Sequence, residues 1–531
     1  MILSKRKKGK PRPQKVILIA PPSRSFRAPE EHLGIAYLAA EGEEKGHHVE
    51  ILDCWLDEIG VNGAVKHALS GRYNVVGLSP SMDSEETTIQ IVKKLRREGF
   101  QGLIILGGYS ATFEVKKYFL RTDKGLSMIF RGEADETFPE FLDFLARKED
   151  WTKMQGIAYL QDGKVVVNPP ARRIDNLDRL PFPRRDTIEQ VIKYRTPTHV
   201  CDSRGCYNRC TFCSIGAFYD LTKDKTRWRG RSPENIVQEL KELQGMGVTM
   251  VKFLGDSFFG GSDWKERAYA LCREIKKRNI KIRFRFSTRV NNIDKELFKE
   301  LKCCGLFAVS LGVESGVQRK LDDYEKHTTI AQNLKAVKIL EELGIYVQMG
   351  FILFDPWVTL KELEQEYLFL EQTKWCVTKG ICSSLFTPDG TKITEKVRKS
   401  CGFKSKKGSN YIYKIQNKKA SNVYKALEIW SQNSVDLYSM AIDPISAPKI
   451  VSPYLLKKFH NIYCQFRNLD MYVFKRLLGF VKQEKEQSHL IRFIEKQIIN
   501  SSDFYTQKEL EIRRLYNLAC LPYKAYSNKY I

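Results

Sequence analysis

Three cysteines, Cys206, Cys210 and Cys213, lie in one short segment with the spacing Cys-x3-Cys-x2-Cys. Three thiolates on one loop can bind three irons of a 4Fe–4S cluster and leave the fourth iron without a protein ligand. That open iron can bind a substrate or a cofactor, which a cluster with four Cys ligands cannot do. A structural zinc site is the alternative. It prefers four protein ligands, and no fourth Cys or His is suitably spaced, although Cys201 is near.

The elements that must position this loop form a series of apolar strands and amphipathic helices from about Thr198. Six such units are too few to close an eight-stranded barrel, so the series predicts an open, partial barrel. The expected strands are His199–Ser203, Met250–Leu254, Ile282–Ser287, Leu306–Leu311, Ile345–Ile352 and Gly380–Phe386. The expected helices are Ser232–Met246, Ser262–Arg278, Asp294–Cys304, Thr329–Leu343 and Leu360–Gln372.

An aromatic residue, Phe212, immediately precedes the third Cys, and the loop follows the first strand of the series. In these features the sequence resembles radical S-adenosylmethionine enzymes. The resemblance implies that the open iron chelates the amine and carboxylate of S-adenosylmethionine. One electron from the cluster then cleaves the sulfonium to methionine and a 5′-deoxyadenosyl radical.

Further motifs of that family resemble segments at consecutive strand ends. Gly255-Asp256 resembles the segment that holds the methionine amine, although it departs from the usual Gly-Gly-Glu, and Glu314 resembles the residue that accepts the ribose hydroxyls. In the fifth-strand motif, whose backbone meets adenine, Phe354 replaces the second Gly. The residues that the resemblance assigns to S-adenosylmethionine are Phe212, Gly255, Asp256, Ser287, Arg289, Glu314, Ser315, Gly350 and Ile352.

Upstream, from Lys15 to Lys148, a second alternation of strands and helices predicts a parallel, doubly wound sheet. Such sheets bind ligands at the carboxyl ends of their strands. The expected strands are Val16–Ala20, Val49–Leu52, Val75–Ser79, Leu103–Leu106 and Met128–Phe130. The expected helices are Glu30–Lys45, Val61–Leu69, Glu85–Arg97, Thr112–Leu120 and Glu136–Arg147.

This region resembles the cobalamin-binding domain that precedes the barrel in many radical S-adenosylmethionine enzymes, through segments such as Leu33–Ala40, Gly107–Thr112 and Gly132–Phe138. Glycines would let a strand end approach the flat macrocycle closely. The alternative is a Rossmann-like domain that binds no ligand. The residues expected at cobalamin are Pro22, Ser23, Trp55, Ser79, Ser81, Gly107, Gly108, Tyr109 and Glu133.

Cobalamin mutases and methionine synthase carry Asp-x-His-x-x-Gly, whose His ligates cobalt. Here the corresponding loop reads Asp53-Cys54-Trp55, without His. The resemblance therefore implies a cobalt without an imidazole lower ligand, as is common among the radical-enzyme relatives. Trp55 is expected either to cover the lower face of the macrocycle or to be a core aromatic.

Two related classes of enzyme are excluded by the other cysteines. Methylthiotransferases acting on transfer RNA carry a second three-Cys cluster in the N-terminal domain, but residues 1–200 contain only Cys54. Auxiliary C-terminal clusters are not expected, because the cysteines from Cys376 onward lack close pairing. Cys303 and Cys304 lie in an expected helix, where we expect them to serve packing.

The composition, 42% hydrophobic and 11% aromatic among 531 residues, indicates a globular chain. No apolar run is long enough to span a bilayer and the basic N-terminus has no apolar stretch, so we expect a cytoplasmic protein with reduced thiols, not bound to membranes. The net charge of +25 divides into +7 on residues 1–15, +3 on 16–390 and +15 on 391–531. The basic ends favour an anionic substrate over a nucleic acid, and we expect Lys404, Lys406 and Lys407 to meet it.

These features predict an α/β fold with a basic tail at 1–14, a Rossmann-like cobalamin-binding domain at 15–150, a linker with a hairpin at 151–197, a partial (β/α)6 barrel at 198–390 and a mainly helical C-terminal domain at 391–531. The resemblance implies a methyltransferase that acts on an unactivated carbon through a 5′-deoxyadenosyl radical and methylcobalamin. Its substrate would be a small molecule or peptide, its electron donor a flavodoxin or ferredoxin, and its state a monomer. The alternatives are a non-methylating rearrangement or cyclisation with the same cofactors, and an iron–sulfur RNA-binding module.

Overall fold

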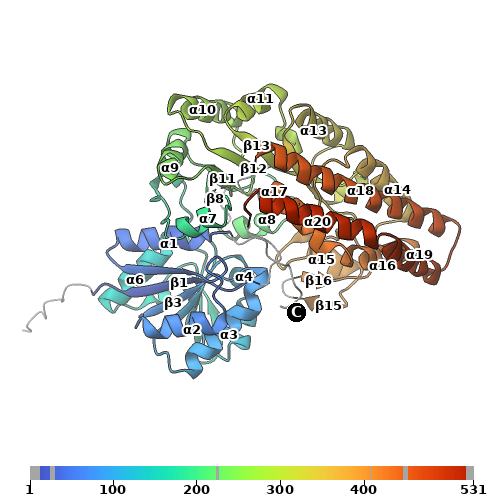
Figure 1. The fold of residues 1–531 in the computed structure, drawn as a ribbon. Coiled ribbons are helices and arrows are strands. Elements are labelled where there is room, and N and C mark those ends of the chain that lie inside the picture. Colours follow the sequence, from blue (N-terminus) through green and yellow to red (C-terminus); the bar gives the residue numbers. More distant parts are fainter. Residues whose placement is uncertain (1–11, 24–29, 223–225, 408–409, 447–451, 522–531) are drawn as a thin grey trace, which may run out of the picture. The chain divides into compact units, whose positions relative to one another are not determined.

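The structure is a computed structural model that describes residues 12–23, 30–222, 226–407, 410–446 and 452–521 (Figure 1). Most of the expected basic tail, residues 1–11, lies outside these ranges. The chain divides into two compact units, each described by itself. Unit 1 comprises Met1–Arg24, Glu31–Thr187 and Phe218–Asp224, and unit 2 comprises Ser25–Glu30, Ile188–Ala217 and Lys225–Ile531. None of the described helices is both long enough and apolar enough to cross a membrane.

Unit 1 is built on a seven-stranded sheet with the order β2-β1-β3-β4-β5-β6-β7. Its first five strands are parallel and in the doubly wound order, which confirms the expected fold class. The hairpin expected in the linker joins this sheet instead, because β6 pairs antiparallel with β5. The strands are β1 (Lys15–Ala20), β2 (His48–Asp53), β3 (Val75–Leu78), β4 (Leu103–Leu106), β5 (Met128–Phe130), β6 (Ile157–Gln161) and β7 (Lys164–Val167).

Helices cover both faces of this sheet, since its buried strands are apolar on both sides. In Figure 1, α1 (Leu33–Glu44) and α6 (Thr137–Arg147) lie on one face, and α2 (Val61–Ser70) and α3 (Glu85–Arg97) lie on the other. The helix expected at Thr112–Leu120 is two short helices, α4 (Tyr109–Phe113) and α5 (Val115–Arg121), because the backbone leaves the helical conformation at Glu114 between them. The remaining described helical elements up to residue 193 are η1 (Met82–Ser84), η2 (Trp151–Lys153), η3 (Leu177–Arg179) and α7 (Ile188–Lys193).

Unit 2 contains a five-stranded parallel sheet with the order β14-β13-β12-β11-β8, which confirms the partial barrel. On β12, Phe284 and Phe286 pack into the hydrophobic core. Because successive side chains of a strand point to opposite faces, Arg285 and Ser287 lie on the other face, the inner face of the sheet. The strands are β8 (Thr198–Val200), β11 (Met250–Phe253), β12 (Arg283–Arg289), β13 (Leu306–Glu314) and β14 (Tyr346–Phe351). The helical elements between them are α9 (Pro233–Gly245), α10 (Trp264–Lys277), η5 (Val290–Asn292), α11 (Lys295–Cys303), α12 (Gln318–Asp323) and α13 (Ile330–Glu342), and α14 (Leu360–Gln372) follows β14.

The sixth expected strand, Gly380–Phe386, does not form a continuous ladder. Its Ser384 makes an isolated parallel bridge to Phe354, beyond the end of β14. At Gly380 the backbone has φ +86°, which is outside the strand conformation and leaves this segment irregular.

The first expected strand, His199–Ser203, is also divided in two. After β8 the chain forms β9 (Ser203–Gly205), which pairs antiparallel with β10 (Trp228–Gly230), and the cysteine loop leads into α8 (Ser214–Tyr219) and η4 (Asp220–Thr222). Gly205 ends β9 with φ +82°, and a Cβ atom there would lie 1.8 Å from the carbonyl oxygen of Arg227. This close approach requires glycine immediately before Cys206.

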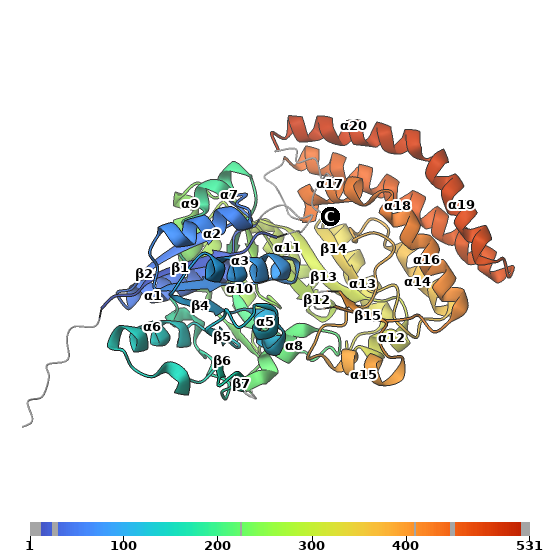
Figure 2. The same cartoon turned by 90° about the horizontal axis from the view of Figure 1, so that it is seen from below.

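The C-terminal region is mainly helical, as expected, and its long helices α17, α18 and α20 lie together in Figure 2. Its core includes a buried polar network in which Asp470 accepts hydrogen bonds from the Trp430 indole and the Tyr438 hydroxyl. The elements are α15 (Lys392–Ser400), α16 (Lys418–Gln432), α17 (Val435–Ser446), α18 (Pro453–Lys482), α19 (Gln487–Asn500), α20 (Ser502–Leu518) and the hairpin strands β15 (Ser405–Lys407) and β16 (Asn410–Ile412).

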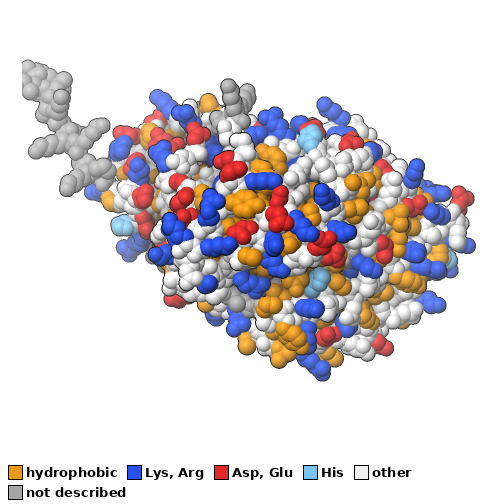
Figure 3. All heavy atoms as spheres, turned by 90° about the horizontal axis from the view of Figure 1, so that it is seen from above, with side chains coloured by type: hydrophobic (Ala, Val, Ile, Leu, Met, Phe, Trp, Pro, Cys, Tyr) orange, Lys and Arg blue, Asp and Glu red, His pale blue; other side chains and the backbone are white. Residues whose placement is uncertain are grey.

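On the face shown in Figure 3, Lys and Arg side chains are interspersed with acidic and apolar ones. In the β15–β16 hairpin, Lys406 forms an ion pair with Asp389 at 2.6 Å, while Lys404 is exposed. Part of the basic charge expected to meet substrate is therefore used in surface ion pairs.

Candidate functional site

The loop that carries Cys206, Cys210 and Cys213 is held by the turn that follows α12. Thr211 Oγ1 donates to the carbonyl of Asp323 at 2.9 Å, and Asn208 Nδ2 donates to the carbonyl of Glu325 at 3.0 Å. The three thiols are half-buried and free. A segment more than one hundred residues later in the chain thus shapes the loop.

Two nitrogen donors approach the middle thiol. Asn208 Nδ2 lies 2.9 Å from Cys210 Sγ and Arg289 Nη1 lies 3.3 Å from it. Arg289 itself is 6% exposed and also donates to the carbonyl of Lys326. Burial raises the pKa of Cys213 to about 11 and raises that of Cys206, so metal binding, which needs thiolates, must release protons here. The donors around Cys210 stabilise sulfur as an anion.

Gly255 and Asp256 lie against the base of the cysteine loop. A Cβ atom on Gly255 would lie 2.1 Å from Ser203 Oγ, and the Gly255 N–H donates to the buried carboxyl of Asp202 at 3.0 Å. Burial raises the pKa of Asp202. Asp256 accepts the N–H of Gly205 at 2.9 Å. Glycine at 255 is therefore required for packing, and Asp256 supports the loop directly before Cys206.

Glu314 ends β13 in an unusual conformation. Its φ is +71°, a conformation that non-glycine residues rarely adopt, and the pairing of β13 with β14 shifts register at this point. Its carboxylate lies 3.2 Å from Lys326 Nζ. A Cβ atom on Gly312 would lie 2.8 Å from Glu314 Oε1, and one on Gly350 would lie 3.3 Å from Oε2. The two glycines leave the space that this carboxylate occupies.

The other residues expected at S-adenosylmethionine divide into two groups. Ser287 is half-buried on the inner face of β12, Ile352 donates its N–H to the carbonyl of Glu314 at 2.7 Å, and Phe212 packs edge-on against Tyr324. Ser315, in contrast, is fully buried, and its hydroxyl donates to Glu366 at 2.6 Å. The structure brings Ser287, Ile352 and Phe212 to the carboxyl edge of the sheet, but directs Ser315 into the fold.

Sequence reasoning missed the buried ion pair of Lys320 and Glu366 behind Glu314. Both side chains are fully buried and their charged atoms are 2.9 Å apart. Glu366 also accepts the N–H of Gly316 at 2.7 Å, and burial raises its pKa. The two residues are 46 positions apart on different helices, and no local pattern in the sequence signals their pairing.

The residues expected at cobalamin all follow strands of unit 1 at one edge of its sheet, since β1 to β5 are parallel. This edge is where doubly wound sheets bind ligands. Pro22 and Ser23 follow β1, Trp55 follows β2, Ser79 and Ser81 follow β3, Gly107, Gly108 and Tyr109 follow β4, and Glu133 follows β5.

Close backbone approach characterises this edge. Gly108 has φ +89°, and a Cβ atom there would lie 3.1 Å from Ser79 Oγ. After β2, the carboxyl of Asp53 accepts the N–H groups of His32 and Leu56 at 3.0 and 3.1 Å, and burial raises its pKa to about 6. The half-buried Trp55 lies in the loop that Asp53 shapes.

Three other expected residues of this edge make contacts within unit 1. Ser81 begins a turn and exchanges hydrogen bonds with Ser84, while the Tyr109 ring lies 5.8 Å from that of Phe218. Glu133 is half-buried, one residue after Gly132, whose N–H donates to Thr112 Oγ1. Among the expected residues of this edge that the structure describes, hydroxyl-bearing residues and glycines outnumber the charged ones, of which there is one, Glu133.

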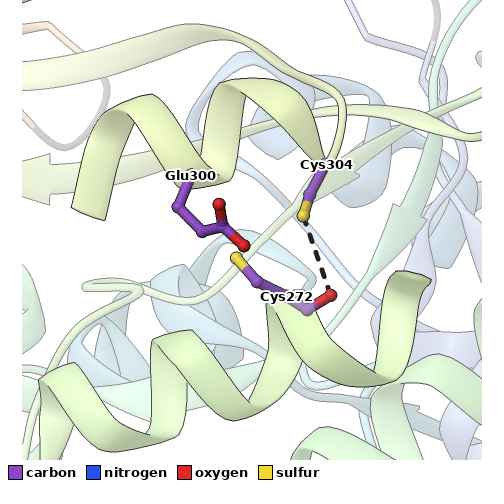
Figure 4. A group of neighbouring side chains, drawn as sticks. All are labelled: Cys272, Glu300 and Cys304. Atoms are coloured by element: carbon purple, nitrogen blue, oxygen red, sulfur yellow. Dashed lines mark hydrogen bonds between the residues drawn. The ribbon is translucent and has the colours of Figure 1, made fainter. Parts of the chain in front are cut away.

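A separate group of possible metal ligands lies between α10 and α11, on the helical side of the unit 2 sheet. Figure 4 shows the Cys272 sulfur directed toward the Glu300 carboxylate, with Cys304 Sγ donating to the carbonyl of Cys272 at 3.7 Å. Glu300 already pairs with Lys276. The three ligand atoms are one short of a structural zinc site, and we assign no ion to them.

The residues present fit the groups that the resemblance implies. The cysteine loop offers three thiols with no fourth cysteine ligand on the same loop, and the glycines at positions 107 and 108 leave the unit 1 edge without side chains at that point. Cys201, the near fourth sulfur, instead donates to the carbonyl of Ser203 at 3.5 Å. This donor set suits a cluster with one open iron better than a closed zinc site.

Comparison with known families and proteins gives the same two domains. Residues 200–370 match the radical SAM superfamily, and residues 24–142 match the B12 binding domain. An uncharacterized methyltransferase of Pyrococcus horikoshii is 29% identical over 371 residues, which are 67% of this chain and 78% of the relative. The 4′-phospho-dehydrooxetanocin synthase of Priestia megaterium is 26% identical over 352 residues, 61% of this chain but only 46% of that enzyme.

Among solved structures, the cobalamin-dependent S-adenosylmethionine radical enzyme OxsB with aqua-cobalamin bound matches with a TM-score of 0.78 and 19% identity. The match covers 97% of this chain and 82% of that one. At this identity the likeness concerns the fold, and it extends over the C-terminal helices as well.

Proposed function

Because this chain belongs to the cobalamin-binding radical S-adenosylmethionine enzymes, we propose that it transfers a methyl group to an unactivated carbon of a small-molecule substrate. The observation that carries the proposal is the loop of Cys206, Cys210 and Cys213, which offers three cluster ligands in a chain whose residues 24–142 match a B12 binding domain. The methyltransferase from Pyrococcus horikoshii supports methyl transfer as the reaction.

When bound, the 4Fe–4S cluster supplies the electron that cleaves S-adenosylmethionine, and cobalamin supplies the methyl group. The chain's own residues bind and orient these groups. Cys206, Cys210 and Cys213 hold the cluster, and Asn208 and Arg289 donate hydrogen bonds to the middle sulfur, which stabilises its negative charge.

At the carboxyl edge of the unit 2 sheet, the Glu314 carboxylate occupies the space left by Gly312 and Gly350. There it accepts hydrogen bonds from the ribose hydroxyls of S-adenosylmethionine. Its ion pair with Lys326 fixes the direction of the carboxylate. At the edge of unit 1, the glycines after β4 and the serine hydroxyls after β3 hold cobalamin. Positioning of reactants, rather than acid–base chemistry, is the main contribution of these residues.

The experiment uses anaerobically reconstituted enzyme with cobalamin, a reductant and S-adenosylmethionine that carries a trideuterated methyl group. We expect 5′-deoxyadenosine from radical generation and S-adenosylhomocysteine from methylation of the cofactor. Added metabolite extract should then yield a product that retains the deuterated methyl group.

The matched control is the variant in which Cys206, Cys210 and Cys213 are all changed to Ala, which should form no 5′-deoxyadenosine. Formation of 5′-deoxyadenosine by the wild type without S-adenosylhomocysteine or any labelled product would contradict methyl transfer. It would favour a non-methylating rearrangement or cyclisation with the same cofactors.

For the remaining partners, we propose a flavodoxin- or ferredoxin-type electron donor and a monomer in the cytoplasm. Cluster reduction by purified flavodoxin, followed by its absorbance, and the mass measured by light scattering test the first two proposals. Substantial binding of RNA with a cluster that cannot be reduced would favour an iron–sulfur RNA-binding module instead.

A further inference from the structure

The inner face of the unit 2 sheet carries a row of polar side chains across all five strands. Buried parallel strands normally carry apolar residues on both faces, so this row needs an explanation. His199 on β8 is in register with Lys252 on β11, and Lys252 is in register with Arg285 on β12. Ser310 on β13 and Gln348 on β14 are in register with Ser287, two residues beyond Arg285, and the Arg285 side chain reaches both by hydrogen bonds.

Hydrogen bonds and ion pairs connect the row into one network. Glu30 Oε2 lies 2.7 Å from Lys252 Nζ and 3.3 Å from His199 Nε2. Arg285 Nη2 donates to Gln348 Oε1 at 2.7 Å and to Ser310 Oγ. Among the described residues, Glu30 is the carboxylate of this network, and Lys252 and His199 already share it.

The positive charge of the network therefore exceeds its negative charge, and the excess lies at Arg285. That side chain is 2% exposed, and its Nη1 has no hydrogen-bond partner among the described residues. Burial lowers the pKa of Arg285 to about 10, which leaves it charged at neutral pH. Glu30 also attracts Arg285, but this one carboxylate is already paired with Lys252 and His199, so the buried guanidinium is only partly compensated and the site is prepared for an anionic partner.

The row lies below the proposed cofactor site on the same strand. Arg285 precedes Arg289 by four residues of β12, a rise of about 13 Å along a strand. Toward the carboxyl edge from the row, Leu254 is 37% exposed, Gly350 is exposed and Ser287 is half-buried. Within the row, Ser310 and Gln348 are half-buried. A metabolite of this length could place its anionic end at the row and a carbon near the edge.

We propose that Arg285 and Lys252, with Ser310 and Gln348, bind an oxyanion group of the substrate, a phosphate or a carboxylate, on the inner face of the unit 2 sheet. This inference rests on the proposed function for the identity of the bound molecule as substrate. It places the anion site on the barrel sheet rather than at Lys404, Lys406 and Lys407, where the charge distribution of the sequence led us to expect it. Arg285 Nη1, the guanidinium nitrogen without a partner among the described residues, donates to the anion, and Lys252 supplies a second charge.

The test measures binding of inorganic phosphate and, separately, of acetate to the reconstituted holoenzyme at constant ionic strength with chloride as the balancing ion. Wild type should bind phosphate, acetate or both saturably, and the preferred anion identifies the substrate's group. Arg285→Gln and Lys252→Gln should each weaken that binding at least tenfold. Because Arg285 is buried, Lys252→Gln, at a partly exposed site, keeps the test valid if Arg285→Gln does not fold.

The matched control is Lys295→Gln, which removes one positive charge on α11 from an exposed ion pair with Glu342 of α13 and should bind the anion as wild type does. Unchanged anion binding in Lys252→Gln, or no saturable binding of either anion by wild type, overturns the inference. The readout is binding rather than turnover. Failure of methyl transfer with intact, Lys252-dependent anion binding would therefore contradict the proposed function and not the anion site.

Discussion

Removal of the buried ammonium of Lys320 tests how the proposed S-adenosylmethionine site is held. Lys320 Nζ donates to the carbonyl of Leu353 at 2.8 Å, to Glu366 at 2.9 Å and to the carbonyl of Ile352 at 3.3 Å. Glu366 in turn accepts hydrogen bonds from Ser315 and Gly316, the two residues after Glu314. The pair thus joins the end of β13, where Glu314 lies, to the end of β14.

Lys320→Met retains the apolar stem but leaves the Glu366 carboxylate buried without a counter-charge. Breaking a fully buried pair in this way costs roughly 3–5 kcal/mol. At about 2–4 °C per kcal/mol for a domain of 150–250 residues, and somewhat less for a larger one, the unfolding midpoint of unit 2 should fall by roughly 5–10 °C. The affinity for S-adenosylmethionine should fall as well, since Glu314 loses its support.

The pH dependence of this loss follows from Glu366. Burial already raises the pKa of Glu366, and loss of Lys320 raises it further, so folded Lys320→Met holds a proton that the unfolded chain releases. A group whose pKa is raised on folding favours the folded state as the pH falls. The destabilisation should therefore be smaller near pH 5.5 than near pH 8, where roughly the full cost applies.

The assay is anaerobic thermal unfolding by differential scanning calorimetry, combined with calorimetric titration of S-adenosylmethionine. Lys335→Met is the matched control, because Lys335 is exposed on the neighbouring helix α13, and it should unfold like wild type. In Lys320→Met/Glu366→Gln the loss should be smaller than the sum of the single losses, by roughly 1–3 kcal/mol. A midpoint for Lys320→Met within about one degree of wild type would refute the reasoning.

Three further predictions concern the cofactor sites. In a chemical iron assay, wild type should bind about four irons, whereas the variant with Ala at Cys206, Cys210 and Cys213 should bind none. Iron retained by that variant would contradict the assignment of these cysteines as ligands. Gly205→Ala should lose the cluster's visible absorbance, because its Cβ would lie 1.8 Å from a backbone oxygen, whereas Gly402→Ala, with open space around it, should keep it. Electron paramagnetic resonance of bound cob(II)alamin should show no axial nitrogen coupling, since Trp55 stands where a ligating His would; a clear coupling would contradict this.

The amino-acid sequence by itself determined the features that depend on short spacing and local periodicity. The Cys-x3-Cys-x2-Cys loop is local, and the alternation of strands and helices indicated both sheets, because each strand is a short apolar run and each helix has its own amphipathic pattern. The residues expected at cobalamin reached one edge for the same reason, since parallel strands end at a common edge.

The tertiary structure decided what depends on residues far apart in the chain. Lys320 meets Glu366, and Arg289 meets Cys210, only because helices and strands pack, and no pattern within one segment specifies a partner dozens of residues away. Ser315 is directed away from the ligand edge by such a partner, although its neighbour Glu314 is not.

The inner row of unit 2 lies between these two cases. The alternation of Arg and Phe in β12, Arg283-Phe284-Arg285-Phe286, is readable in the sequence as one charged and one apolar face. Which face meets the core, and that Lys252 and Gln348 stand beside Arg285, became known only from the order and register of the strands. Burial of Arg285 then makes its charge costly to leave unpaired, because a guanidinium removed from water requires hydrogen-bond and charge partners that an exposed one does not.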